Sequence, residues 1–139
     1  MKFLHTRVRV GDLDAPIRFY RNGLGLELLS VRPYAQGRFT LAYLAAPGDS
    51  AAQFELTYNW DEKEYAVGRN FGHIAYAVDN IYVACERLHQ HGALIARPPR
   101  DGWMAFARSP DGVSIELFQV GAELAPAEPW RSKANEGTW

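Results

Sequence analysis

Apolar and polar residues alternate along the segment from Phe54 to Trp60, which predicts a β-strand. Successive side chains of a strand point to opposite faces. One face then carries Gln53, Glu55, Thr57 and Asn59, and the other carries Phe54, Leu56, Tyr58 and Trp60. A carboxylate is costly to bury alone in such an apolar run. The pattern therefore predicts a cation, a metal ion or water beside Glu55.

The chain before this strand shows a regular succession of patterns. Residues 2–10 alternate between apolar side chains and a histidine followed by two arginines, which predicts a strand with one polar face. Asp12 or Asp14 is then placed to cap a helix that ends at a glycine. Two more strands are expected near residues 27–31 and 38–44. The predicted order is strand, helix and three strands.

The same order begins again at His73. A helix is expected after a cap at Asp79 or Asn80, because apolar residues then follow at helical spacing. Strands are expected at residues 73–78, 94–97, 103–107 and 113–119. The last of these contains Glu116 between two apolar residues, as the earlier strand contains Glu55. We therefore interpret the chain as an internal duplication, in which each half supplies one histidine from its first strand and one glutamate from its last.

Composition narrows the classes of function. The 139 residues include 15 basic and 16 acidic side chains, a net charge of -1, which argues against nucleic-acid binding. The single cysteine, Cys85, excludes an internal disulfide and a CxxC metal site. The first residues lack a signal-peptide core, and no apolar segment reaches membrane-spanning length. We expect a cytoplasmic protein without a membrane partner.

Residues 121–139 show no periodicity and contain two prolines, which predicts an irregular tail. Two of its aromatic residues, Trp130 and Trp139, are expected to dock on the body of the protein or on a partner subunit.

The two histidines and two glutamates on polar strand faces suggest a divalent-metal site. Imidazole with carboxylate suits zinc, nickel, cobalt or iron. The alternative is a purely structural network, in which Arg7 and Arg9 pair with Glu55. Repetition of the same residue types at equivalent points of both halves favours the metal site.

Several motifs, namely FLHTRVRVGDLD, FYRNGLGLELL, FELTYNW, GHIAYAVDNI and SPDGVSIEL, make the chain resemble bacterial glyoxalase I, the lactoylglutathione lyases of the vicinal-oxygen-chelate superfamily. The resemblance implies an α+β fold, a single domain over residues 1–120 built from two βαβββ modules, about 1–60 and 72–120, that form a half-barrel. It also implies a homodimer. Each metal site would combine two ligands from one subunit with two from the other, in the order His5 and Glu55, then His73 and Glu116.

The resemblance further implies the activity and its residues. Family members isomerise the hemithioacetal of methylglyoxal and a thiol to the S-D-lactoyl thioester, with glutathione as co-substrate. Glu116 would be the principal base and Glu55 its counterpart, on one divalent ion per site; nickel or cobalt is favoured, and zinc stays open. The γ-glutamyl group of the thiol would be bound by Arg9, Asn59 and Arg69.

The segment 96–106 departs from the family pattern, because it is shorter than the corresponding loop and contains no lysine. Arg97 or Arg100 could replace that lysine, and Trp103 could line the opened site. The shorter form is similar to the trypanosomatid enzymes, so the thiol stays open. The rival hypotheses are another metalloenzyme of the superfamily, with a different thiol or substrate, and a metal-free protein that sequesters small molecules. Glu55 argues against the related epimerases and thiol transferases, and retention of all four ligands argues against the sequestering protein.

Overall fold

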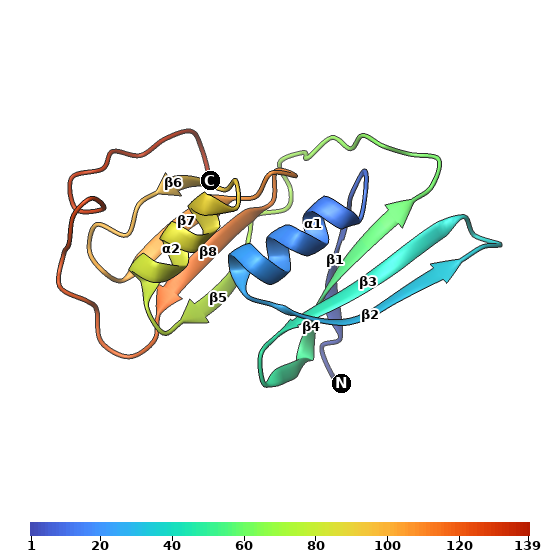
Figure 1. Cartoon of the computed structure of the whole chain (residues 1–139), viewed down its shortest axis with the longest axis horizontal. Helices are drawn as coiled ribbons and strands as arrows, with labels where there is room; N and C mark the ends of the chain where they lie inside the picture. The colour runs from blue at the N-terminus through green and yellow to red at the C-terminus, as the bar shows by residue number, and fades with distance from the viewer. The chain divides into compact units, whose positions relative to one another are not determined.

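The computed structural model describes all 139 residues, which form two compact units, Met1–Ala66 and Val67–Trp139 (Figure 1). Each unit contains one four-stranded mixed sheet with helical structure on one face. No helix combines the length and the apolar character needed to cross a membrane.

The first unit follows the order strand, helix, three strands. Its sheet has the strand order β1-β4-β3-β2, with β1 parallel to β4 and the other pairs antiparallel. A short α-helix continues directly into a π-helix, η1. The elements are β1 (His5–Arg9), α1 (Asp14–Arg18), η1 (Phe19–Leu24), β2 (Glu27–Tyr34), β3 (Phe39–Ala46) and β4 (Asp49–Asn59).

The second unit repeats this plan with one longer helix. Its sheet has the order β5-β8-β7-β6, with β5 parallel to β8, which is the topology of the first unit shifted along the chain. The α+β class and the predicted βαβββ order of each half are thus confirmed. The elements are β5 (Ile74–Val78), α2 (Ile81–Gln90), β6 (Leu94–Arg97), β7 (Met104–Arg108) and β8 (Ser114–Gln119).

The helices begin and end where capping residues allow it. In the first unit, the Asp12 carboxylate accepts a hydrogen bond from the amide of Ala15 at 3.0 Å. In the second, the Asn80 side chain accepts bonds from the amides of Tyr82 and Val83, both at 3.1 Å, which satisfies two otherwise unpaired donors of α2. Gly92 follows α2 with a φ of 92°, the left-handed conformation that glycine adopts without strain.

Each helix covers one face of its sheet. The opposite face carries no helix and is here called the open face. In the first unit, Phe54 and Leu56 of β4 are buried on the helical side, where the ring of Tyr20 lies edge-on to Phe54 with a centroid distance of 4.8 Å. In the second, Ile115 and Leu117 of β8 are buried on the side of α2. Because strand side chains alternate, the glutamates between these apolar residues point to the opposite, open face.

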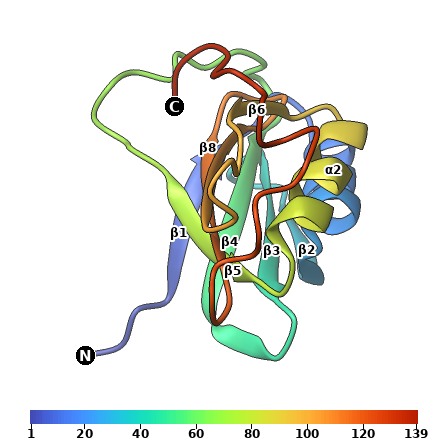
Figure 2. The same cartoon turned by 90° about the vertical axis from the view of Figure 1, so that its left-hand side faces the viewer.

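Residues 121–139 form neither helix nor strand and run along the second unit (Figure 2). Trp130 is buried, at 4% exposure, which confirms that its ring docks on the body of the protein. The Arg100 guanidinium donates to the carbonyl of Lys133 at 3.0 Å and to the side chain of Asn135 at 2.8 Å. The tail is therefore fixed by specific contacts despite its irregular backbone.

Candidate active site

The open face of the first sheet brings a histidine and a glutamate together. The register pairs Arg7 and Tyr43, from the two neighbouring strands, with Glu55 at the centre of β4. His5 precedes Arg7 by two residues and shares its face. The Nε2 atom of His5 lies 3.2 Å from Oε2 of Glu55. Only 3% of Glu55 is exposed, so this carboxylate depends on its neighbours for polar contacts.

Three further side chains surround the Glu55 carboxylate. The Thr57 hydroxyl donates to Oε1 at 2.8 Å, and Nε of Arg7 lies 4.0 Å from the same oxygen. Burial, together with a hydrogen bond to Glu55, raises the pKa of the Tyr43 phenol above its ordinary value. The phenol therefore stays neutral and can donate near neutral pH. Glu55 is held in one orientation from several sides.

The second sheet contains the equivalent pair in different surroundings. Nε2 of His73 lies 3.0 Å from Oε2 of Glu116. The residues that occupy the places of Arg7 and Tyr43 are Ala75 and Phe106, according to the strand register. Phe106 lies edge-on to the His73 ring, with a centroid distance of 5.4 Å. Glu116 therefore shares its histidine contact with Glu55 but has apolar neighbours where Glu55 has polar ones.

Each pair fits two adjacent positions around an octahedral metal ion. Two donor atoms that bind one ion at about 2.1 Å and at a right angle are about 3.0 Å apart. The His–Glu separations of 3.2 and 3.0 Å match this value. Within the chain, no three or more histidine, cysteine, aspartate or glutamate side chains gather around one point. Each unit thus supplies two suitable donors, a nitrogen and an oxygen.

Two of the three residues assigned to the thiol lie in the first unit. Asn59, at the end of β4, donates through its side-chain amide to the Glu62 carboxylate at 3.2 Å and to the Tyr65 hydroxyl at 3.0 Å. Burial raises the pKa of Tyr65, and the positive charge of Arg9 acts in the opposite direction. Arg9 pairs with Thr57 in the strand register, two residues before Asn59 on β4, so Arg9 and Asn59 lie near each other on the same face of the sheet.

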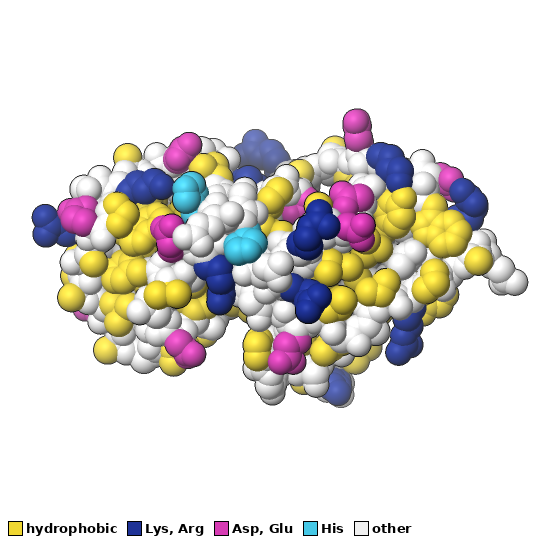
Figure 3. All heavy atoms as spheres, in the orientation of Figure 1, with side chains coloured by type: hydrophobic (Ala, Val, Ile, Leu, Met, Phe, Trp, Pro, Cys, Tyr) yellow, Lys and Arg dark blue, Asp and Glu magenta, His cyan; other side chains and the backbone are white.

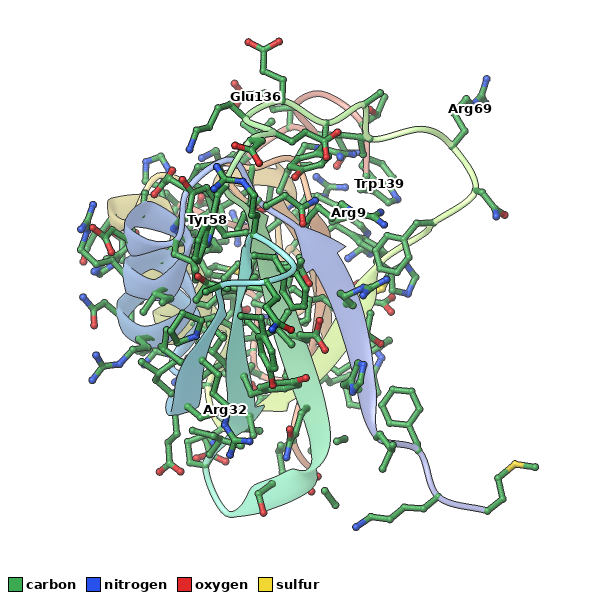
Figure 4. The ribbon with its side chains drawn as sticks, turned by 90° about the vertical axis from the view of Figure 1, so that its right-hand side faces the viewer. Arg9, Arg32, Tyr58, Arg69, Glu136 and Trp139 are labelled. Carbon is green, nitrogen blue, oxygen red and sulfur yellow. The ribbon has the colours of Figure 1, made fainter.

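The third residue, Arg69, belongs to the second unit and precedes β5. Its side chain points away from the ribbon (Figure 4). The arginines of the shortened segment are engaged within the chain: Arg97 donates to Asp101 at 2.9 Å, and Arg100 binds the tail as described above. Acidic, basic and apolar side chains are interspersed on the face drawn in Figure 3, as the net charge of -1 suggests.

Sequence reasoning did not identify Tyr43 as a neighbour of Glu55. The two residues lie on adjacent antiparallel strands, and only the register between β3 and β4 brings them together. Thr57 was placed on the correct face by alternation, but its bond to Glu55 needs a side-chain conformation that the alternation does not specify.

Residues 2–117 match the model of the Glyoxalase/Bleomycin resistance protein/Dioxygenase superfamily. The chain belongs to this superfamily. A lactoylglutathione lyase of Haemophilus influenzae is 43% identical over 125 residues, covering 86% of this chain and 93% of the relative. That of Neisseria meningitidis serogroup A is 42% identical over the same length and covers 86% and 91%.

Among solved structures of this superfamily, the trypanothione-dependent glyoxalase I of Leishmania major is similar. It superimposes with a TM-score of 0.78 at 34% identity, covering 86% of both chains.

Proposed function

We propose that this protein is a lactoylglutathione lyase, that is, a glyoxalase I. The observation that carries the proposal is the His–Glu pair repeated at equivalent register positions of both units, at 3.2 and 3.0 Å. The naming of the relatives at 42–43% identity supports the same activity. We further propose a cytoplasmic homodimer, in which His5 and Glu55 of one subunit and His73 and Glu116 of the other form each site.

The reaction is an isomerisation that needs no oxidant and loses no atom. In the hemithioacetal R–CO–CH(OH)–SR′, C1 is the carbon bonded to sulfur and C2 is the ketone carbon. A proton leaves C1 and a proton is added to C2, while the hydroxyl proton moves from the C1 oxygen to the C2 oxygen, which gives the thioester R–CH(OH)–CO–SR′. The proton on C1 is a very weak acid in water. The site must therefore stabilise the negative charge that develops on the hemithioacetal when this proton leaves, and it must position a base. A divalent ion on the four ligands, nickel or cobalt in preference to zinc, would supply Lewis-acid stabilisation of that charge.

The proposed division of labour between the carboxylates rests on their different surroundings. Glu55 is oriented by Thr57, Tyr43 and Arg7, so it is suited to a fixed ligand and counterpart. Glu116 has one polar contact, to His73, and an adjacent phenylalanine. A carboxylate with few hydrogen bonds can turn toward a substrate at a smaller cost. We therefore assign proton transfer at C1 and C2 chiefly to Glu116.

The thiol is proposed to bind through Arg9, Asn59 and Arg69. Arginine can pair with a carboxylate through two parallel hydrogen bonds, which suits the γ-glutamyl group of glutathione. Arg97 and Arg100 have partners within the chain, and the segment 96–106 contains no lysine for the second carboxylate of glutathione. This observation keeps a thiol that lacks this charge, such as a trypanothione-type conjugate, as the second candidate.

The test is thioester formation, followed by ultraviolet absorbance, from methylglyoxal and glutathione. Metal-free protein is reloaded in parallel with nickel, cobalt and zinc. Activity in any of these samples supports the proposal. Inactivity with every metal, both with glutathione and with a trypanothione-type thiol, rejects it. The variant Glu116→Gln should lose turnover by roughly 10²- to 10⁴-fold, the contribution of a positioned base. Glu123→Gln, at an exposed position of the tail, is the matched control. Near-normal activity of the first variant would mean that another group moves the proton.

A further inference from the structure

The residues from Glu136 to Trp139, here called the 136–139 segment, follow the edge of the second sheet. The Glu136 amide donates to the carbonyl of Ala96 in β6 at 2.9 Å. The Arg108 guanidinium, from β7, donates to the Thr138 carbonyl through Nε at 3.1 Å and through Nη2 at 2.7 Å. These three bonds fix the backbone on both sides of Gly137. The segment therefore has a defined position relative to β6 and β7.

This position brings Trp139 to the open face of the sheet. Its ring stacks on Phe106 with a centroid distance of 5.8 Å and an interplanar angle of 20°. Phe106 in turn lies edge-on to His73 and opposite Glu116 in the strand register. Trp139 nevertheless keeps 48% of its surface exposed. A large apolar ring is thus held one side chain away from the His–Glu pair, with part of its surface available for contact.

The surroundings indicate which part of a substrate meets this ring. A γ-glutamyl group carries charges, and its proposed partners are Arg9, Asn59 and Arg69. The open face beside Glu116 is instead aromatic: besides Phe106 it carries Phe118, which lies edge-on to the partly exposed Trp103 at 6.0 Å. Apolar surface of this kind favours a hydrocarbon group.

We infer that Trp139 is a specificity-determining residue, whose ring contacts the hydrocarbon substituent R that the 2-oxoaldehyde brings to the hemithioacetal. The inference rests on the proposed function. Trp139 makes the irregular tail part of the substrate site, so the tail and the segment 96–106 cover the substrate site together. An aromatic substituent gains more from the ring than a methyl group does, so Trp139 raises the preference for aromatic 2-oxoaldehydes.

The alternative is that the 136–139 segment only covers the edge strand β6, as loops often do to block unwanted pairing. Both roles predict some loss of stability when the segment is released. Only the specificity role predicts a change in the ratio of kcat/KM between an aromatic and a methyl substrate. That ratio is therefore the quantity to measure.

The experiment compares the hemithioacetals of phenylglyoxal and methylglyoxal. Trp139→Ala should lower kcat/KM for phenylglyoxal, relative to methylglyoxal, by about 2- to 10-fold, the range expected for one aromatic contact. Trp139→Phe should retain most of the preference. Arg108→Gln, which frees the Thr138 carbonyl, should reproduce the loss. The control is Glu136→Ala in the same segment, because that side chain points away from the ribbon (Figure 4).

A binding measurement separates this inference from the activity. S-benzylglutathione and S-methylglutathione are unreactive thioethers that carry an aromatic and a methyl group. The Trp139 emission, obtained as the difference between the wild-type protein and Trp139→Phe, should change with the benzyl compound and not with the methyl compound. An unchanged emission on binding, or an unchanged ratio in Trp139→Ala, overturns the inference alone. A wild-type protein that turns over neither hemithioacetal and binds neither thioether rejects the proposed function as well.

Discussion

The bond from Thr57 to Glu55 offers the most direct test of the fixed carboxylate. Valine has nearly the shape of threonine but lacks the hydroxyl, so Thr57→Val removes the 2.8 Å bond and little else. Glu55 is 3% exposed, and water has little access to replace the lost donor. The remaining neighbours, His5, Arg7 and Tyr43, still restrain the carboxylate, but Oε1 loses its closest partner.

The size of the effect follows from the charge on the acceptor. Hydrogen bonds to charged groups contribute about 1.5–3 kcal/mol, compared with about 1 kcal/mol for neutral pairs. If Glu55 is a metal ligand, this energy appears as metal affinity, and about 1.4 kcal/mol corresponds to a tenfold change. Thr57→Val should therefore weaken metal binding by roughly 10- to 100-fold, which is the usual effect of losing a partner that orients a ligand.

The assay is isothermal titration calorimetry, in which nickel is added to metal-free protein. Thr6→Val is the matched control, because it makes the same change on neighbouring β1, opposite Phe54 and on the helical side of the sheet. The two variants should differ in nickel affinity and share the wild-type circular dichroism spectrum. Equal affinities would show that Glu55 does not bind the ion, or that its orientation has no influence on binding.

Two further predictions concern the thiol site and the core. Arg9→Ala should raise KM for the glutathione hemithioacetal roughly 10- to 100-fold with a much smaller effect on kcat, because it removes binding remote from the reacting carbons. Arg18→Ala, on the exposed side of α1, is the control. An unchanged KM in Arg9→Ala would mean that the thiol binds elsewhere. Burial raises the pKa of the Cys85 thiol from 9.0 to about 12, so the stability due to the neutral thiol is complete below about pH 9 and is lost as pH rises toward 12. The free energy of unfolding, from denaturant titrations, should fall across this pH range, and it should fall less steeply in Cys85→Ala. Equal slopes against pH in the two proteins would contradict the raised pKa of Cys85. Tyr76, with a pKa raised to about 12 by burial, contributes to the same fall above pH 10.

Strand alternation and capping predicted most of the regular structure. The polar faces of β1 and β4 follow directly from the residue pattern, and the duplication placed a second histidine and glutamate at matching positions. Asn80 was one of two candidate caps, and its side-chain bonds identify it as the N-cap of α2. These features depend on residues close together in the sequence, which is why pattern reasoning reaches them.

Features that depend on distant residues were less predictable. β4 begins at Asp49, five positions before the predicted start, because Gln53 and Asp49 still pair with the end of β3 across an irregularity in the register. The helix after Asp12 changes to a π-helix at Phe19, which apolar spacing does not reveal. The anchoring of Thr138 by Arg108 joins residues thirty positions apart, on either side of β8 and most of the irregular tail, and no local pattern encodes it.

The two units keep a histidine and a glutamate at matching positions but have diverged around them, with Arg7, Tyr43 and Thr57 in one copy where the other has Ala75, Phe106 and Phe118. In evolutionary terms, the copies are no longer interchangeable. A chain made of the first unit twice would keep every histidine and glutamate but would clamp both carboxylates, leaving none free to act as a base. A chain made of the second unit twice would leave both without a fixed orientation. Duplication supplied the scaffold, and under the proposed roles the unequal neighbours give each copy a task that the other cannot perform.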